Sequence, residues 1–265
     1  MALFTDQFVS DVADLVAYEA NLPDVSAAEG IDLGTKLRLA HTEIGAQLEA
    51  ASRGPGNVYL ANGSGWQSTG GEGNPARFAL SQVVVTPPLK LLHTFQTLAI
   101  VYRDAYNRKL NDKYLPKWKE YKELANWARD LLFQTGIGLS ARPIPRPDAA
   151  VIDWTPSTLG AGARFVRMTW IGTDGTEGVG SVEQAAQVPA ENALRVTPPV
   201  SPEGVTGWNV YVGGSSGDIS KQNGPALAVD SAWVEPESGL VAGEPPGEGQ
   251  APDLFKTVPR FLQRG

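Results

Sequence analysis

The stretch that decides the fold is residues 86–138, TPPLKLLHTFQTLAIVYRDAYNRKLNDKYLPKWKEYKELANWARDLLFQTGIG. Thr86 is of a type that caps helices through its hydroxyl, and Pro87 and Pro88 suit a first turn, where amide donors are not needed. We therefore predict that a helix begins at Thr86. Apolar residues then recur at steps of three and four, which indicates one face turned toward a partner. They are Leu92, Phe95, Ala99, Tyr102 and Tyr106.

The same stretch contains a second helix after a break at Tyr114–Pro116. Pro116 would clash with the carbonyl four residues before it if the first helix continued. Gly136 stands where a left-handed residue can end the second helix. Its predicted core stripe is Trp118, Tyr121, Ala125, Ala128 and Leu132. Leu124, Trp127 and Leu131 lie alongside this stripe. Trp118, Tyr121, Trp127 and Phe133 at helical spacing usually belong to a core, but part of this surface can meet a neighbouring copy.

The composition bounds the class of protein. The chain has 265 residues, 42% of them apolar and 19% charged, which is typical of globular domains. Without cysteine it can form neither disulfides nor thiolate metal sites. A net charge of -7 argues against a protein that grips phosphates by charge. The N-terminus lacks a basic segment and no apolar run reaches membrane length, so we expect a protein made in the cytoplasm.

One local excess of positive charge lies at 103–129, with eight basic and four acidic residues. The simpler interpretation is the solvent face of two amphipathic helices, stabilised by pairs such as Lys119–Glu123.

The residues before this stretch predict two more helices, at 5–19 and 32–52. Residues 53–76 hold seven glycines and two prolines in 24 positions, which favours a long mobile loop. Tyr59, Leu60 and Trp66 are its only large apolar side chains. A short extended run at 83–85 then leads into Thr86. We predict that residues 1–139 form a small antiparallel helical bundle.

The composition changes after Leu139, because 14 of the 20 prolines and 17 of the 29 glycines fall in residues 140–265. Residues 140–148 are predicted to be a proline-rich linker. Seven short runs then follow with alternating polarity, at 149–154, 163–171, 181–186, 194–197, 208–212, 227–230 and 232–235. Asp174-Gly175 is a hairpin signal. This spacing predicts an immunoglobulin-like or fibronectin-type-III-like sandwich over residues 149–242.

Residues 243–265 are predicted to be a linker followed by a C-terminal arm, residues 253–262. The arm has no core in easy sequence reach, yet it is rich in apolar residues, so we expect it to dock on a partner. Its expected contact residues are Leu254, Phe255, Lys256, Val258, Arg260, Phe261 and Leu262. An alternative is that the arm folds back onto its own sandwich.

No constellation for catalysis is visible. His41 and His93 lie within helical patterns without partners at ligand spacing, so packed or surface histidines are expected and no metal or cofactor is predicted. Gly213–Gly217 fits a nucleophile motif, but no helix follows it, so we predict a turn between strands. Glu120 and Glu123 share a helix face among lysines and are interpreted as solvated. We predict that the chain is not an enzyme.

The pattern of residues 83–139 resembles the head-to-tail connector (adaptor) proteins of tailed bacteriophages. Residues 194–217, LRVTPPVSPEGVTGWNVYVGGSSG, look like the immunoglobulin-like modules often appended to phage structural proteins. The resemblance implies a structural protein of the virion neck. It would form a ring, usually of twelve copies, beneath the portal and around the DNA channel, and its C-terminal arm would hold the portal.

On that resemblance, we expect Tyr59, Leu60 and Trp66 to contact the next tail component and the DNA to pass without sequence-specific binding. No membrane partner is expected. Two alternatives remain open. One is a virion-surface adhesion or decoration protein whose sandwich binds host carbohydrate. The weaker one is a peptidoglycan-cleaving enzyme that uses Glu120 and Glu123.

Overall fold

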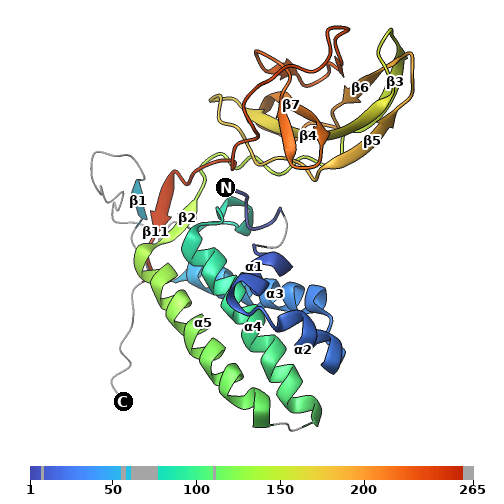
Figure 1. Cartoon of the computed structure of the whole chain (residues 1–265). Coiled ribbons are helices and arrows are strands. Elements are labelled where there is room, and N and C mark those ends of the chain that lie inside the picture. The colour runs from blue at the N-terminus through green and yellow to red at the C-terminus, as the bar shows by residue number, and fades with distance from the viewer. Residues whose placement is uncertain (7–8, 55–57, 61–76, 110–111, 259–265) are drawn as a thin grey trace. The chain divides into compact units, whose positions relative to one another are not determined.

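A computed structural model describes residues 1–6, 9–54, 58–60, 77–109 and 112–258. The described chain has five α-helices and several antiparallel sheets, so it is a mixed α plus β protein (Figure 1). Its contacts divide it into two compact units. The helical unit comprises Gln7–Ala141 and Pro252–Gly265. The sheet unit comprises Met1–Asp6 and Arg142–Ala251, so the first six residues, which the sequence predicts in the helical domain, belong to the other unit.

The helical unit is built around α4, which contacts each of the other four helices (Figure 1). Its helices are α1 (Val12–Tyr18), α2 (Leu22–Glu29), α3 (Leu33–Arg53), α4 (Pro87–Lys109) and α5 (Leu115–Thr135), with short 3-10 turns η1 (Leu80–Gln82) and η2 (Asp112–Tyr114). From Leu92 to Tyr102, every α4 residue except Gln96 is buried. The expectation of one buried face is therefore wrong for α4. The polar side chains of Thr94 and Thr97 are accommodated there because each hydroxyl donates to a carbonyl of its own helix.

The first helix is shorter than predicted, and an additional helix follows it. α1 begins only after Asp11, because Asp11 and Asp14 form a reciprocal capping box. α2, which the sequence analysis did not predict, starts at Leu22 directly after Asn21, since Pro23 is well tolerated in a first helical turn.

The break before Pro116 is confirmed. η2 ends at Tyr114, and α5 begins at Leu115 with Pro116 in its first turn. The helix start after Thr86 is also confirmed, but the predicted hydroxyl cap is wrong, because Thr86 Oγ1 is buried without a hydrogen-bond partner among the described residues. A hydroxyl cap accepts a hydrogen bond from an amide in the first helical turn, and Pro88, at the second helical position, has no amide proton to donate.

The C-terminal segment forms the central strand of a small antiparallel sheet, in the order β1 (Val58–Leu60), β11 (Leu254–Lys256), β2 (Ile137–Leu139). A free arm is therefore wrong for Leu254–Lys256, and so is folding back onto the sandwich, because the strand pairs within the helical unit. Gly136 has a positive φ of 105°, and an added Cβ there would lie 3.1 Å from Phe255 Cβ. The glycine thus ends α5 and lets β11 approach.

The sheet unit contains two antiparallel sheets (Figure 1). One has the order β10-β6-β3, and the other has the order β5-β4-β7-β8, with β9 also paired to β7. Their strands are β3 (Val151–Pro156), β4 (Gly162–Gly172), β5 (Gln184–Val188), β6 (Asn192–Thr197), β7 (Val205–Ser215), β8 (Asp218–Lys221), β9 (Leu227–Ala228) and β10 (Trp233–Val234). All seven predicted runs contain strands. β8, with the polar sequence DISK, gave no alternation signal.

Both sheets contribute to one apolar core. Val166, Met168 and Trp170 of β4 and Trp208, Val210 and Val212 of β7 meet Leu194, Val196 and Trp233 of the other sheet. The predicted alternation of β4 and β7 is therefore confirmed. Ser216 and Gly217 form the turn that joins β7 to β8, with Gly217 at a positive φ of 77°. The predicted turn is therefore present, but residues 213–215 still belong to β7.

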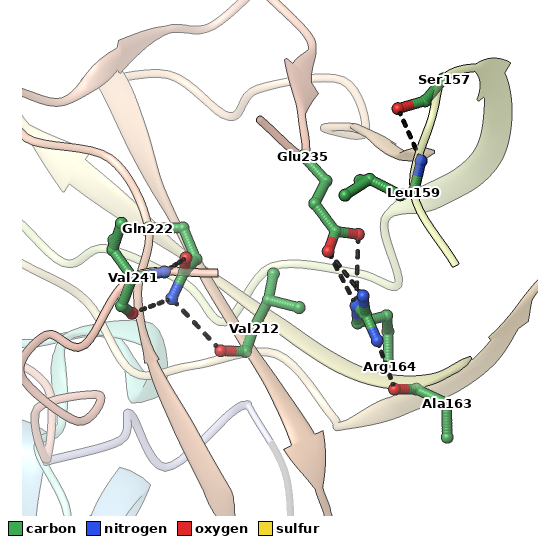
Figure 2. Close-up of polar contacts among 8 residues, drawn as sticks. All are labelled: Ser157, Leu159, Ala163, Arg164, Val212, Gln222, Glu235 and Val241. Carbon is green, nitrogen blue, oxygen red and sulfur yellow. Dashed lines mark hydrogen bonds and ion pairs between the residues drawn. The ribbon is translucent and has the colours of Figure 1, made fainter. Parts of the chain in front are cut away.

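A buried ion pair joins strands of the two sheets (Figure 2). The Arg164 guanidinium of β4 donates from Nε and Nη2 to Glu235 Oε1, at 3.0 and 2.7 Å, and from Nε to Oε2 at 3.2 Å. Glu235, which follows β10, has a fully buried side chain. Figure 2 also shows Gln222 exchanging hydrogen bonds with the backbone of Val241, which holds the segment after β10 against β8.

Candidate interaction surfaces

α5 is held on one side by α4 and exposes most of the rest. The buried side chains of Tyr121, Ala125, Ala128 and Leu132 form the face that packs on α4, as the sequence predicts. Tyr106 of α4 stacks on Trp118, with ring centroids 5.8 Å apart. Trp127, by contrast, is 52% exposed. α5 is therefore anchored by one aromatic face and presents another tryptophan outward.

A buried hydrogen-bond network fixes the first half of α5. Tyr121 stacks on Tyr102 at 5.6 Å between ring centroids and donates its hydroxyl proton to Glu19 Oε2 at 2.8 Å. Lys117 Nζ lies 3.0 Å from the same oxygen. Burial, followed by the adjacent Glu19 carboxylate, raises the pKa of Tyr121, so its hydroxyl stays protonated and donates. α5 therefore presents its outer residues on a rigid support.

The exposed charged residues of α5 fall largely on two sides. The exceptions are Lys117, which pairs with Glu19 and Glu120, and Asp130, which pairs with Arg129. At about 100° per residue, Glu120 and Glu123 lie with Leu124, Trp127 and Leu131 along one side, which we call the acidic side of α5. The opposite side, the basic side of α5, carries Lys119, Lys122 and Arg129 with Trp118 and Phe133. Glu120, Glu123, Lys119 and Lys122 are all exposed, which confirms a solvated face. The expected Lys119–Glu123 pair does not form in the described structure.

The residues predicted to meet the next tail component are only partly described. β1 places Tyr59 opposite Phe255 and Leu60 opposite Leu254, whereas Trp66 lies outside the described residues. The expectation that this whole loop lacks regular structure is wrong at 58–60, because the returning β11 supplies a partner strand that local sequence does not reveal.

The described part of the C-terminal arm packs within the helical unit. Leu254, Phe255 and Val258 are partly exposed, but Lys256 is fully buried. Lys256 Nζ donates to Ser52 O at 3.0 Å, at the end of α3, and lies over the Phe78 ring. Lys256 was expected to contact a partner, and this expectation is wrong, because its ammonium is buried within the helical unit. Arg260, Phe261 and Leu262 lie outside the described residues.

The two histidines come together, which the sequence did not indicate. The ring centroids of His41 on α3 and His93 on α4 are 6.0 Å apart, and His93 Nδ1 shares a hydrogen bond of 2.6 Å with Ser10 Oγ. Only helix packing brings these distant positions together. Burial, then the neighbouring His41, lowers the pKa of His93 to about 4, while Asp14 acts weakly in the opposite direction.

This pKa predicts acid sensitivity of the helical unit. The pKa of His93 is about 6.5 when unfolded and about 4 when folded, so the unfolded state binds the proton first as pH falls. The contribution of His93 to the free energy of unfolding is therefore fully present above about pH 6.5. It is lost as the pH falls toward 4, by about 3 kcal/mol for this group alone. We expect His93→Gln, measured by denaturant unfolding from pH 7.5 to 4, to flatten this dependence. His41→Gln should flatten it less, because burial also lowers the pKa of His41, whereas that of His93 falls to about 4. Equal pH slopes for wild type and His93→Gln would contradict the assignment.

The sheet unit presents apolar side chains on its three-stranded sheet. β3 is an edge strand, and its Val151 and Trp154 are about half exposed, as is Val234 of β10. The other sheet carries a polar cluster in which Glu177 Oε1 accepts hydrogen bonds from Thr169 Oγ1, Asn209 Nδ2 and Tyr211 Oη. These bonds outweigh burial and lower the pKa of Glu177. The polar groups around Glu177 are hydrogen-bonded to one another, whereas β3 lies at the edge of its sheet with half-exposed apolar side chains.

The two carboxylates considered for catalysis do not lie in an enclosed site. Glu120 and Glu123 both lie exposed on α5, and Glu120 is 3.4 Å from Lys117. In the described part of the chain no three His, Asp or Glu side chains gather where they could hold a metal ion. No helix within the described ranges is long and apolar enough to cross a membrane.

Comparisons of the chain with protein-family models, curated proteins and solved structures find no match.

Proposed function

We propose that the chain is a structural head-to-tail adaptor of a tailed bacteriophage. Copies form a ring of twelve beneath the portal and around the DNA channel, and join the capsid to the tail. The observation that supports this best is α5, whose one face is anchored on α4 while a half-exposed tryptophan and two oppositely charged sides remain available. Half-exposed aromatic residues with aliphatic neighbours are typical anchors of protein interfaces.

The finer architecture belongs to the same proposal. We interpret the helical unit as an antiparallel bundle and the sheet unit as an immunoglobulin-like sandwich. The sheet unit is inserted between β2 and β11, which are hydrogen-bonded neighbours. Asp253 accepts from the Ala141 amide at 2.9 Å, so the outgoing and returning chains are tied together within the helical unit. We interpret the sheet unit as an accessory module joined to the helical unit by two adjacent chain segments.

The proposed partners are the portal protein and the next neck or tail protein, in a virion assembled in the host cytoplasm. Since β11 is integral to the helical unit, portal binding is assigned to the residues that follow it, together with the exposed parts of Leu254 and Phe255. Residues 53–76 are assigned to the downstream component. DNA passes through without sequence-specific binding, as the net charge of -7 favours.

Co-sedimentation with portal particles tests this function. We expect the full chain to bind portal particles, and a chain ending at Val258 to lose most of that binding while keeping its melting temperature, because β11 and Lys256 remain. A chain with scrambled residues 259–265 is the matched control for length. Absence of the full chain from portal particles and from the neck of imaged virions would contradict the adaptor role.

The half-exposed Trp154 on an open strand edge favours a second candidate, a surface protein that binds carbohydrate through its sheet unit. Glycan binding that is lost on Trp154→Ala, with no binding to the portal, would select this candidate instead.

A further inference from the structure

We propose that α5 is the contact between neighbouring copies of this chain, with the acidic side of one α5 packed in parallel against the basic side of the next. This contact rests on the proposed adaptor function only for the closure of successive copies into a ring. The contact itself is argued from α5, whose residue pattern offers two complementary sides on one helix. Both copies use the same helix but different faces, so the interface is heterologous.

The positions of the two sides around the helix axis allow each copy to contact two neighbours at once. At about 100° per residue, the centre of each side lies about a quarter turn from the face buried on α4. Glu123 and Lys119 come closest to each other, about 40° apart on the outward face, whereas Glu120 and Lys122 lie about 160° apart. A neighbour on the acidic side and another on the basic side therefore do not compete for space. Both also leave the packing of Tyr121, Ala125, Ala128 and Leu132 on α4 undisturbed.

The charges match in height along the helix. Copies related by rotation about an axis parallel to α5 place equal residue numbers at equal heights. Glu120 and Glu123 then differ from Lys119 and Lys122 of the neighbour by one residue each, or about 1.5 Å along the axis. Glu123, Lys119 and Lys122 make no ion pair in the described structure, and Glu120 is 53% exposed, so these charges are available to a neighbour.

The apolar residues match in the same register. Trp127 lies within two residues, or about 3 Å, of the height of Arg129 on the neighbour, where a guanidinium can stack on the indole face. Arg129 and Asp130 pair at 3.4 Å but remain 39% and 41% exposed. Leu131 stands two residues from Phe133 of the neighbour, and both are partly buried already. Each contact thus combines an aromatic anchor with opposite charges.

The alternative contact between two copies is disfavoured by the same charges. A two-fold, antiparallel arrangement with both α4 helices on one side brings acidic side against acidic side, or basic against basic. Like charges placed opposite one another in an interface oppose association. In the parallel, head-to-tail contact, Glu120 and Glu123 meet Lys119 and Lys122 of the neighbour, and Arg129 meets Trp127.

Charge exchange between copies tests the contact directly. Glu120→Lys/Glu123→Lys makes both sides basic, and Lys119→Glu/Lys122→Glu makes both sides acidic. We expect wild type to associate in sedimentation velocity, each variant alone to lose association by more than about tenfold, and the equimolar mixture to recover it. The quadruple variant with all four exchanges restores complementarity within one chain and should associate as wild type does. Unchanged circular dichroism and melting show that each variant is folded.

Three results would overturn the contact. The first is wild type that remains monomeric at about 1 mM, where even a millimolar contact is half formed. The second is equal association of all variants. The third is DNA binding that is lost on Lys119→Glu/Lys122→Glu while association is unchanged, which would assign the basic side to nucleic acid. Because none of these measurements uses the portal, a failed contact and a failed adaptor role remain distinguishable.

Discussion

Ending the chain at Ala251 is expected to unfold the helical unit and to leave the sheet unit folded. The truncation removes β11, which is the central strand of its sheet, so β1 and β2 lose their pairing at once. It also removes Lys256, whose buried ammonium donates to the last carbonyls of α3. Total stabilities of domains are about 5–15 kcal/mol, so these combined losses exceed what a unit of this size can tolerate.

The single substitution Lys256→Ala separates the side chain from the strand. A hydrogen bond from a charged group contributes about 1.5–3 kcal/mol, and a cavity adds to the loss, so we expect about 3 kcal/mol of destabilisation. Burial lowers the pKa of Lys256, so the charge is already costly to hold, and Lys256→Met should cost less than Lys256→Ala.

Hydrogen exchange measured by mass spectrometry on the full chain reports each unit separately. After Lys256→Ala, faster exchange is expected in α3 and β2 and unchanged exchange in β4 and β7. The exposed Lys119→Ala is the control for loss of one lysine. If truncation at Ala251 leaves exchange in α3 and α4 as slow as in the full chain, β11 is dispensable and the argument is wrong.

Glu235→Ala is expected to destabilise the sheet unit by about 3–5 kcal/mol, because it leaves the Arg164 guanidinium largely buried without its partner. The side chain of Arg164 is only 17% exposed, and its three hydrogen bonds to Glu235 carry the contact between β4 and the segment after β10. Denaturant unfolding combined with hydrogen exchange in β4 and β7 gives the loss.

A double-mutant cycle identifies the cause. Arg164→Met alone leaves a buried carboxylate, whereas Arg164→Met with Glu235→Leu replaces both charges by apolar groups and should recover much of the stability. Arg195→Met, at an exposed position of β6, is the control. Additive losses for the double variant would show that the two side chains act independently.

The sequence predicted local features whose causes are local. Pro116 breaks the helix wherever the chain folds, and the alternation of Val166, Met168 and Trp170 is the same pattern that a half-buried strand needs. The turn between β7 and β8 was predictable because glycine readily adopts a positive φ such as that of Gly217. The candidate surface was visible only in part, since Trp118, Tyr121, Trp127 and Phe133 were predicted together as core residues or contacts to a neighbouring copy, and only the fold shows that Trp127 is exposed while Tyr121 is buried.

Expectations failed where a distant segment changed the environment. Residues 58–60 and the start of the C-terminal arm carry weak strand signals alone, and each becomes a strand because the other lies beside it. Lys256 was interpreted as a surface cation, because no spacing in the sequence shows that its ammonium reaches the end of α3. The encounter of His41 with His93 is likewise a product of helix packing.

What the sequence by itself determined is α3, α4 and α5, the break between α4 and α5, seven strands of the sheet unit, and the change from helical to sheet structure after Leu139. These depend on backbone dihedral preferences and on hydrophobic period, which act over a few residues. Only the tertiary structure decided that the last strand returns to the centre of the helical unit. Backbone donors and acceptors must find partners, and a segment without its own hairpin takes them from whichever strands packing brings near.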